Sequence, residues 1–213
     1  MSRVRIQVVV LLLFVFSAVG LTSADVSFRG LGTVDGLGNS ANAVSADGSF
    51  VVGSGRYAGL AVGESEAIRW TASGGISFLG DVPGGSTRSF ALGVSADGDV
   101  VVGEGRYGDD SLQYEAFRWT PSGGMVGLGF LPGGTRSSGS GVSADGSVVV
   151  GQGFNATGAS EAFRWTEAGG MQGLGGLVLG GTSFAFNISP DGSTIVGNAH
   201  SGTRGEAAYW TEA

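Results

Sequence analysis

The chain has 213 residues, of which 43 are glycine and none is cysteine, so it has the length of one modest domain that no disulfide stabilises. All 11 basic residues are arginines, against 18 acidic residues. The resulting net charge of −7 argues against a nucleic-acid ligand, because phosphates attract a basic surface, and it disfavours an anionic membrane surface.

Residues 1–24 have the pattern of a secretory signal peptide. Arg3 and Arg5 form a basic start, an apolar run extends from Ile6 to Phe16, and Thr22-Ser23-Ala24 fits a cleavage site of small residues. The run is shorter than the about 20 residues that a membrane-spanning helix needs. We therefore expect cleavage near Ala24, secretion of residues 25–213 to the cell exterior or the periplasm, and no membrane insertion afterwards. The alternative is an uncleaved N-terminal anchor.

Four related segments make up the remainder. The decapeptide V-S-A-D-G-S-F-V-V-G begins at Val44 and returns with small changes at Val94, Val142 and Ile188. A second motif ends in tryptophan and threonine, with the tryptophans at 70, 119, 165 and 210. A repeat of about 46 to 50 residues indicates a repeat architecture. We place the repeats at about residues 40–86, 87–135, 136–181 and 182–213.

The second repeat predicts four short strands. Residues 90–95 form the first, and the Asp97-Gly98 turn leads into a fully apolar strand that begins at Val100. A third strand covers residues 115–120, and a fourth follows over residues 125–129. Four short antiparallel strands in a repeat of this length are typical of a β-propeller blade, so the predicted fold is all-β and propeller-like.

The two ends of the repeat array look complementary. Residues 28–34, F-R-G-L-G-T-V, align with the fourth-strand segments 76–82, 125–131 and 171–177, yet no blade precedes them. The last repeat stops at Ala213, where its fourth strand would begin. We expect strand 28–34 to complete the fourth blade and close a ring, which would give a monomer. The alternative is an open array that associates edge to edge.

The repeat units A-x-G-V-S-A-D-G-x-V-V-V-G, E-A-F-R-W-T and G-G-M-x-x-L-G-x-L-P-G-G resemble the HAF-type extracellular repeats of bacterial exported proteins. The segment S-P-D-G-S-T-I-V-G from Ser189 is similar to the first hairpin of TolB-like propeller blades. The resemblance covers residues 28–213. It implies export and propeller-like β-structure, and it brings no catalytic residue and no established ligand. The last repeat departs from the pattern, because Ala208-Tyr209 replaces Phe-Arg.

Several recurring polar residues could carry chemistry, and each also has a structural explanation. An aspartate occupies each Asp-Gly turn, where one carboxylate is too few for calcium and a turn residue is expected. The strand arginines could face an acidic ligand, or pair between blades with Glu66, Glu115 and Glu161. The tryptophans could stack on sugars, or serve as core side chains. These turn and strand positions are Asp47, Asp97, Asp145, Asp191, Arg69, Arg118 and Arg164.

Catalytic material is scarce. His200 is the single histidine, so neither a nucleophilic triad nor a zinc site is expected, and we predict no cofactor or metal. Asp109 and Asp110 supply two acids on one loop, as a glycosidase would need, although a solvated acidic loop explains them as well.

The loops between second and third strands and the links between blades are expected on one face. Gly-Arg-Tyr occurs there twice, at 55–57 and 105–107, and combines residue types that are enriched at binding hot spots. We predict an exported, non-enzymatic binding or scaffold module for an unknown extracellular protein or glycan. The alternatives are a glycan-binding or glycan-hydrolysing propeller and a purely structural surface repeat protein. The candidate binding face comprises Arg56, Tyr57, Arg106, Tyr107, Asp109, Asp110, Phe154, Asn155, His200 and Arg204.

Overall fold

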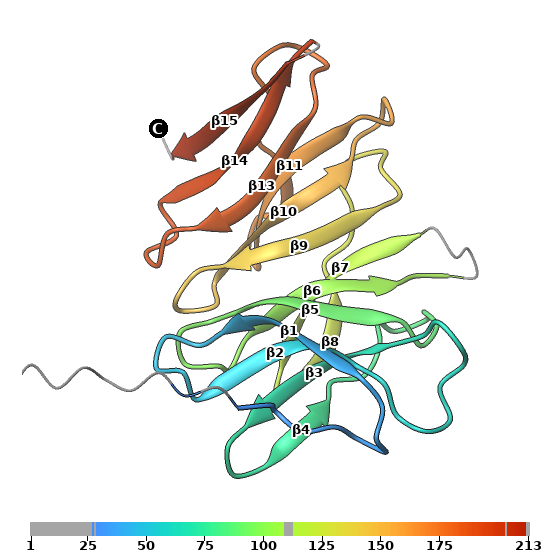
Figure 1. The fold of residues 1–213 in the computed structure, drawn as a ribbon. Helices are drawn as coiled ribbons and strands as arrows, with labels where there is room; N and C mark the ends of the chain where they lie inside the picture. The colour runs from blue at the N-terminus through green and yellow to red at the C-terminus, as the bar shows by residue number, and fades with distance from the viewer. Residues whose placement is uncertain (1–26, 28, 109–112, 203, 212–213) are drawn as a thin grey trace, which may run out of the picture. The chain divides into compact units, whose positions relative to one another are not determined.

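The computed structural model describes residues 27, 29–108, 113–202 and 204–211, so the predicted signal peptide lies outside the described residues. Within these ranges the regular structure consists of β-strands, shown in chain order from blue to red in Figure 1. Their bounds are β1 Asn39–Val44, β2 Phe50–Gly55, β3 Glu66–Thr71, β4 Gly75–Phe78, β5 Ser89–Val94, β6 Val101–Arg106, β7 Tyr114–Thr120, β8 Gly124–Gly127, β9 Ser137–Val142, β10 Val148–Phe154, β11 Ser160–Thr166, β12 Gly170–Gly173, β13 Ser183–Ile188, β14 Thr194–Ser201 and β15 Arg204–Thr211.

Each repeat forms its own antiparallel sheet, with neighbouring strands paired in chain order. The sheets are β1-β2-β3-β4, β5-β6-β7-β8, β9-β10-β11-β12 and the three-stranded β13-β14-β15, here called the first to fourth sheets. Consecutive sheets pack on each other, chiefly through β2 on β5, β6 on β9 and β10 on β13. The all-β, propeller-like fold predicted from the repeats is confirmed.

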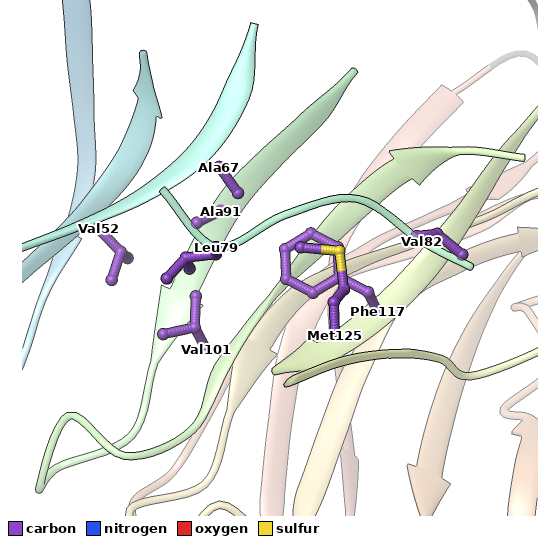
Figure 2. Close-up of a cluster of buried hydrophobic side chains, with 8 residues drawn as sticks. All are labelled: Val52, Ala67, Leu79, Val82, Ala91, Val101, Phe117 and Met125. Atoms are coloured by element: carbon purple, nitrogen blue, oxygen red, sulfur yellow. The ribbon is translucent and has the colours of Figure 1, made fainter. Parts of the chain in front are cut away.

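The apolar second strand of each repeat lies between two sheets, which explains why it does not alternate. Val101 faces a cluster shared with the first sheet, and its neighbour Val102 faces a cluster shared with the third; neither is exposed. Figure 2 shows the first of these clusters, in which Phe117 and Met125 lie side by side. The interior is therefore a series of cores between successive sheets.

The Asp-Gly turns hold the sheets together at one end. Ala46 N donates to Ala96 O, Ala96 N to Ala144 O, and Ala144 N to Pro190 O, over 3.2, 3.0 and 2.9 Å. Proline has no N–H, so the ladder cannot extend beyond Pro190 through the same group. Arg69 adds a side-chain link, because its Nε donates to Gly98 O in the next sheet over 3.0 Å.

A second joint recurs at the link between successive sheets. In the second sheet, Glu115 Oε1 accepts a hydrogen bond from Gly129 N over 2.8 Å. Ser137, the first residue of the third sheet, donates to Gly129 O over 2.7 Å and accepts from Ala116 N over 2.9 Å. Burial raises the pKa of Glu115. We call this arrangement the link clamp; its other copies are Glu66, Gly80, Ser89 and Ala67, and Glu161, Gly175, Ser183 and Ala162.

The link clamp corrects the predicted pairing of the strand arginines. Glu66 and Glu115 accept hydrogen bonds from backbone amides, whereas Arg69 and Arg118 donate to carbonyl oxygens of the next Asp-Gly turn. Arg69 does pair with a carboxylate of the next sheet, since its Nη2 lies 3.6 Å from Asp99 Oδ1, but not with a glutamate of the link clamp. The reason is geometric: along a strand, residues 66 and 69 point to opposite faces, so one sequence motif serves two joints. Trp119, Trp165 and Trp210 pack against the cores, as expected of core side chains.

The expected closing strand at 28–34 does not form as a strand over its described residues, 29–34. Residues 29–33 have no regular secondary structure, Val34 bridges only Leu37, and Asn39 Nδ2 donates to Gly32 O over 2.8 Å. Positive φ angles at Gly32, Asp35 and Gly36 turn this segment toward β1. In the described residues no strand pairs with the outer edge of β15, so the structure does not show the predicted closure.

The turn aspartates predict an acid-sensitive stability. Hydrogen bonds from Ser49 N–H and the Ser45 hydroxyl to the Asp47 carboxylate lower the pKa of Asp47 to about 2. Hydrogen bonds from the Ser143 hydroxyl and Ser147 N–H likewise lower the pKa of Asp145 to about 2. A pKa that is lower in the folded chain contributes stability above the unfolded value of 3.8, and that contribution is lost as pH falls toward 2. Between pH 4 and pH 2, urea denaturation should therefore show a falling unfolding midpoint, and Asp145→Asn should lessen the fall. Glu167→Gln, an exposed control, should not; equal acid sensitivity in all three proteins would contradict the prediction.

Candidate functional site

The predicted binding residues of the first two sheets are used mainly within the fold. The Tyr57 ring packs edge-on against Phe78 with 4.7 Å between centroids, and burial together with Glu66 raises the pKa of Tyr57. Arg106 Nη1 lies 3.6 Å from Glu64 Oε1 and 3.3 Å from Ser86 Oγ.

Arg56 and Tyr107, which adjoin Tyr57 and Arg106 in the sequence, make fewer contacts within the fold. Arg56 makes one long hydrogen bond, of 3.4 Å, to Ala61 O. Tyr107 contacts Phe130 edge-on but is 40% exposed, so it remains accessible to a ligand. Asp109 and Asp110 lie outside the described residues.

The other predicted residues are distributed over the third and fourth sheets. Asn155 folds its own loop, because its Oδ1 accepts from Thr157 N and its Nδ2 donates to Glu161 Oε2, each over 3.0 Å. His200 packs against Phe184 with 6.1 Å between ring centroids, and Arg204 is exposed on β15. Of the eight predicted residues that the structure describes, only Phe154 lines the cavity described next.

A cavity of about 150 Å³ lies between the second and third sheets, at the end where β6, β10 and the preceding link meet. The guanidinium of Arg136 lies 5.2 Å from the centroid of the Phe154 ring, within the range of a cation–π contact. Phe154 N donates to Arg136 O over 3.0 Å, which fixes the link against β10. The lining residues are Glu104, Tyr114, Arg136, Ser137, Ser138, Gln152, Gly153, Phe154 and Ser160.

The cavity carries two charged groups of opposite sign, the Glu104 carboxylate and the Arg136 guanidinium. Among the described residues, neither the Glu104 carboxylate nor the Arg136 guanidinium has a hydrogen bond or an ion pair. With Gln152 and Tyr114 alongside, the lining offers donors, acceptors and aromatic surface at one place. This combination suits a small polar ligand, or one residue of a larger one.

Sequence reasoning missed most of this cavity. Arg136 belongs to a link between repeats, and Glu104 and Gln152 are ordinary strand positions in two different repeats. The available signal was the Arg-Ser pair before the first strand of a repeat, at 88–89 and 136–137, which returns as Thr-Ser at 182–183.

A second hollow, of about 320 Å³, opens near the Asp-Gly turns of the same two sheets. Its Arg118 already donates to Gly146 O, so it offers less unused hydrogen-bonding capacity. In the described part of the chain, no three His, Cys, Asp or Glu side chains gather in a way that could hold a metal ion. Nowhere in the described ranges does the chain form an apolar helix of membrane-spanning length.

No family model and no curated protein matches the chain. Solved structures do. TolB from Acinetobacter baumannii matches with a TM-score of 0.56 at 17% identity, over 83% of this chain and 41% of TolB. The putative TolB from Agrobacterium tumefaciens gives 0.57 at 16%, over 79% and 59%, and a prolyl endopeptidase gives 0.55 at 14%, over 82% and 27%. The chain thus spans less than two thirds of each, and its fold is similar to that of TolB-like β-propeller proteins.

Proposed function

We propose that this chain is an exported, HAF-type repeat protein that acts as a non-enzymatic binding or scaffold module in the periplasm or at the cell exterior. The signal-like segment 1–24 and the repeat motifs support export. The cavity between the second and third sheets carries the binding proposal. It places a carboxylate and a guanidinium, neither hydrogen-bonded to a described residue, beside aromatic surface. Its partner is an extracellular protein or glycan.

The cavity favours recognition over catalysis. Hydrolysis of a glycoside by two acids needs a second carboxylate at a defined distance from the first. Among the described residues that line the cavity, Glu104 is the single acid. The Arg136 guanidinium stays charged at neutral pH and therefore does not transfer a proton. The purified protein should therefore leave oligosaccharides intact. Hydrolysis that is lost on Asp109→Ala or Asp110→Ala would overturn this part of the proposal.

Binding can be tested with a panel of immobilised neutral and acidic oligosaccharides and of peptides, followed by calorimetry on any that bind. Arg136→Ala and Phe154→Ala should each weaken binding about tenfold or more, because each removes a charge-assisted bond or a ring contact. Gln172→Ala, an exposed change on β12, is the matched control and should bind like the wild type. Ligands that bind all three variants equally would exclude the cavity. Failure of every ligand class to bind would favour a purely structural repeat protein.

A further inference from the structure

The segment before β1 already has the conformation of a link between two sheets. Gly32 has φ +89°, close to the +85°, +77° and +70° of Gly80, Gly129 and Gly175 in the three link clamps. The Gly32 carbonyl accepts a hydrogen bond from the Asn39 side chain over 2.8 Å, just as Gly80 O accepts from the Ser89 hydroxyl over 2.9 Å. In both cases the donor is the first residue of the following sheet.

As in the links between sheets, a turn lies between Gly32 and the donor residue Asn39. Leu37 N donates to Val34 O over 2.9 Å, as Gly85 N donates to Val82 O over 2.9 Å in the first complete link. Residues 31–39 thus form half of a link clamp, here called the leading half-clamp. A complete link clamp also contains the glutamate and the alanine of a preceding third strand. The leading half-clamp lacks these two residues in the described part of the chain.

The corresponding glutamate and alanine on β15 are Glu206 and Ala207. Ala207 is paired with Asn198 at the register at which Ala116 is paired with Glu104, so its N–H points the same way as that of Ala116. In the described residues, no side chain accepts a hydrogen bond from Ala207 N. The Glu206 carboxylate accepts one side-chain hydrogen bond there, from the Ser201 hydroxyl. Glu66 and Glu115 are 6% and 8% exposed, whereas Glu206 lies in the open.

The fourth sheet also leaves uncovered the apolar face that each earlier sheet buries against the next. Val52, Val102 and Val150 are 0% exposed, but Val196, at the same position, is 47% exposed. Phe186 and Tyr209 are 53% and 73% exposed on this sheet. In the described residues, the strands that pack extensively on β13 to β15 come from the third sheet, and the first sheet supplies none of these larger contacts.

We propose that a second copy of this chain docks its leading half-clamp and first sheet on the fourth sheet of the first copy. Gly32 N would donate to the partner's Glu206, and Asn39 Oδ1 would accept from the partner's Ala207 N–H. Residues 29–31, which match the fourth-strand pattern, would pair along β15. The contact repeats an interface that the chain makes three times internally. It is heterologous, so it builds rings or chains of copies.

The joint between copies is weaker than the joints inside the chain. Pro190 has no N–H with which to continue the ladder at the Asp-Gly turns, and Tyr209 replaces the arginine that reaches the next turn. Two of the recurring links are therefore absent, while the link clamp remains. Association should accordingly be reversible and depend on protein concentration.

Sedimentation velocity of residues 25–213 over a concentration series tests the proposal. The wild type should associate. Asn39→Ala disables the leading half-clamp, and Glu206→Ala with Ala207→Pro disables the β15 edge, where proline is tolerated because it faces no β14 bond. Each variant should raise the dissociation constant about tenfold or more. Asn39→Ala removes the acceptor of the Ala207 N–H, and the β15 variant removes that N–H together with the charge-assisted bond from Gly32 N to Glu206. Glu167→Ala, an exposed glutamate elsewhere, should associate like the wild type.

Mixing the two disabled variants gives the sharpest result. Each retains one intact surface, so together they should form a one-to-one complex that does not grow, while each alone stays monomeric. Circular dichroism with matching melting curves establishes that both are folded. A wild type that is monomeric at every concentration would overturn the proposal, as would variants that associate undiminished. A monomeric wild type that either variant destabilises would place the half-clamp on β15 of its own chain, which also overturns it.

Discussion

Phe117→Ala is expected to lower the free energy of unfolding by about 3–5 kcal/mol. Phe117 lies on β7 and is 0% exposed. Its ring meets Met125 in the core between the first two sheets (Figure 2) and lies against Gly103 on β6, where a Cβ atom would come within 2.9 Å of the ring. Both neighbours are on strands that β7 itself pairs with, so the cavity cannot close without breaking sheet hydrogen bonds.

This loss is large for a chain of this size, whose total stability is expected at about 5–15 kcal/mol. Urea denaturation measures it directly, and thermal unfolding should show a fall of about 10 °C. Phe186→Ala is the matched control, because that ring is 53% exposed and should cost less than about 1 kcal/mol. A loss below 1 kcal/mol at Phe117 would show that the sheets are not packed as described.

Ser137→Ala should cost about 2–4 kcal/mol although it removes a single oxygen atom. Ser137 is 3% exposed, and its hydroxyl satisfies both Ala116 N and Gly129 O in the link clamp between the second and third sheets. Alanine leaves a buried donor and a buried acceptor without partners, and each such group costs about 1–3 kcal/mol.

Amide hydrogen exchange distinguishes this mechanism from a general loss of packing. The Ala116 amide should lose protection far more than amides within β6, because its acceptor is removed. Ser122→Ala, in the exposed turn before β8, is the control and should change neither stability nor exchange. An unchanged Ala116 exchange rate in the folded Ser137→Ala protein would show that the hydroxyl does not link the two sheets.

Much of the fold could be predicted because repeat, turn and strand signals are local. The predicted strand at 115–120 is β7, Tyr114–Thr120. The apolar run from Val100 continues into the strand β6, Val101–Arg106, which begins one residue later than predicted. Asp97-Gly98 forms a turn that a neighbouring hydroxyl and amide brace, as the residue types indicated. Because four repeats show the same strand pattern, each repeat supports the assignment of the fold class independently. A misplaced boundary in one repeat could therefore not change it.

The partners of the charged side chains could not be predicted in the same way. Glu66 and Arg69 are three residues apart, and sequence alone suggested that they meet opposite charges across a blade boundary. In the structure, Glu66 accepts a hydrogen bond from Gly80 N. Arg69 does meet an opposite charge in the next sheet, because its Nη2 lies 3.6 Å from Asp99 Oδ1, and its Nε donates to Gly98 O, 29 residues further on. Which backbone group lies within reach depends on how two sheets stack, and no local pattern encodes that.

By itself, the sequence determined four all-β repeats, their turns and their buried strands, because each follows from contacts between residues close in the chain. Only the tertiary structure decided which surfaces those repeats leave for binding. The cavity beside Glu104 and Arg136 exists because the second sheet packs on the third, and the free edge of β15 exists because no strand of the described chain covers it. Both are properties of the space between sheets, where the nearest neighbours come from different repeats.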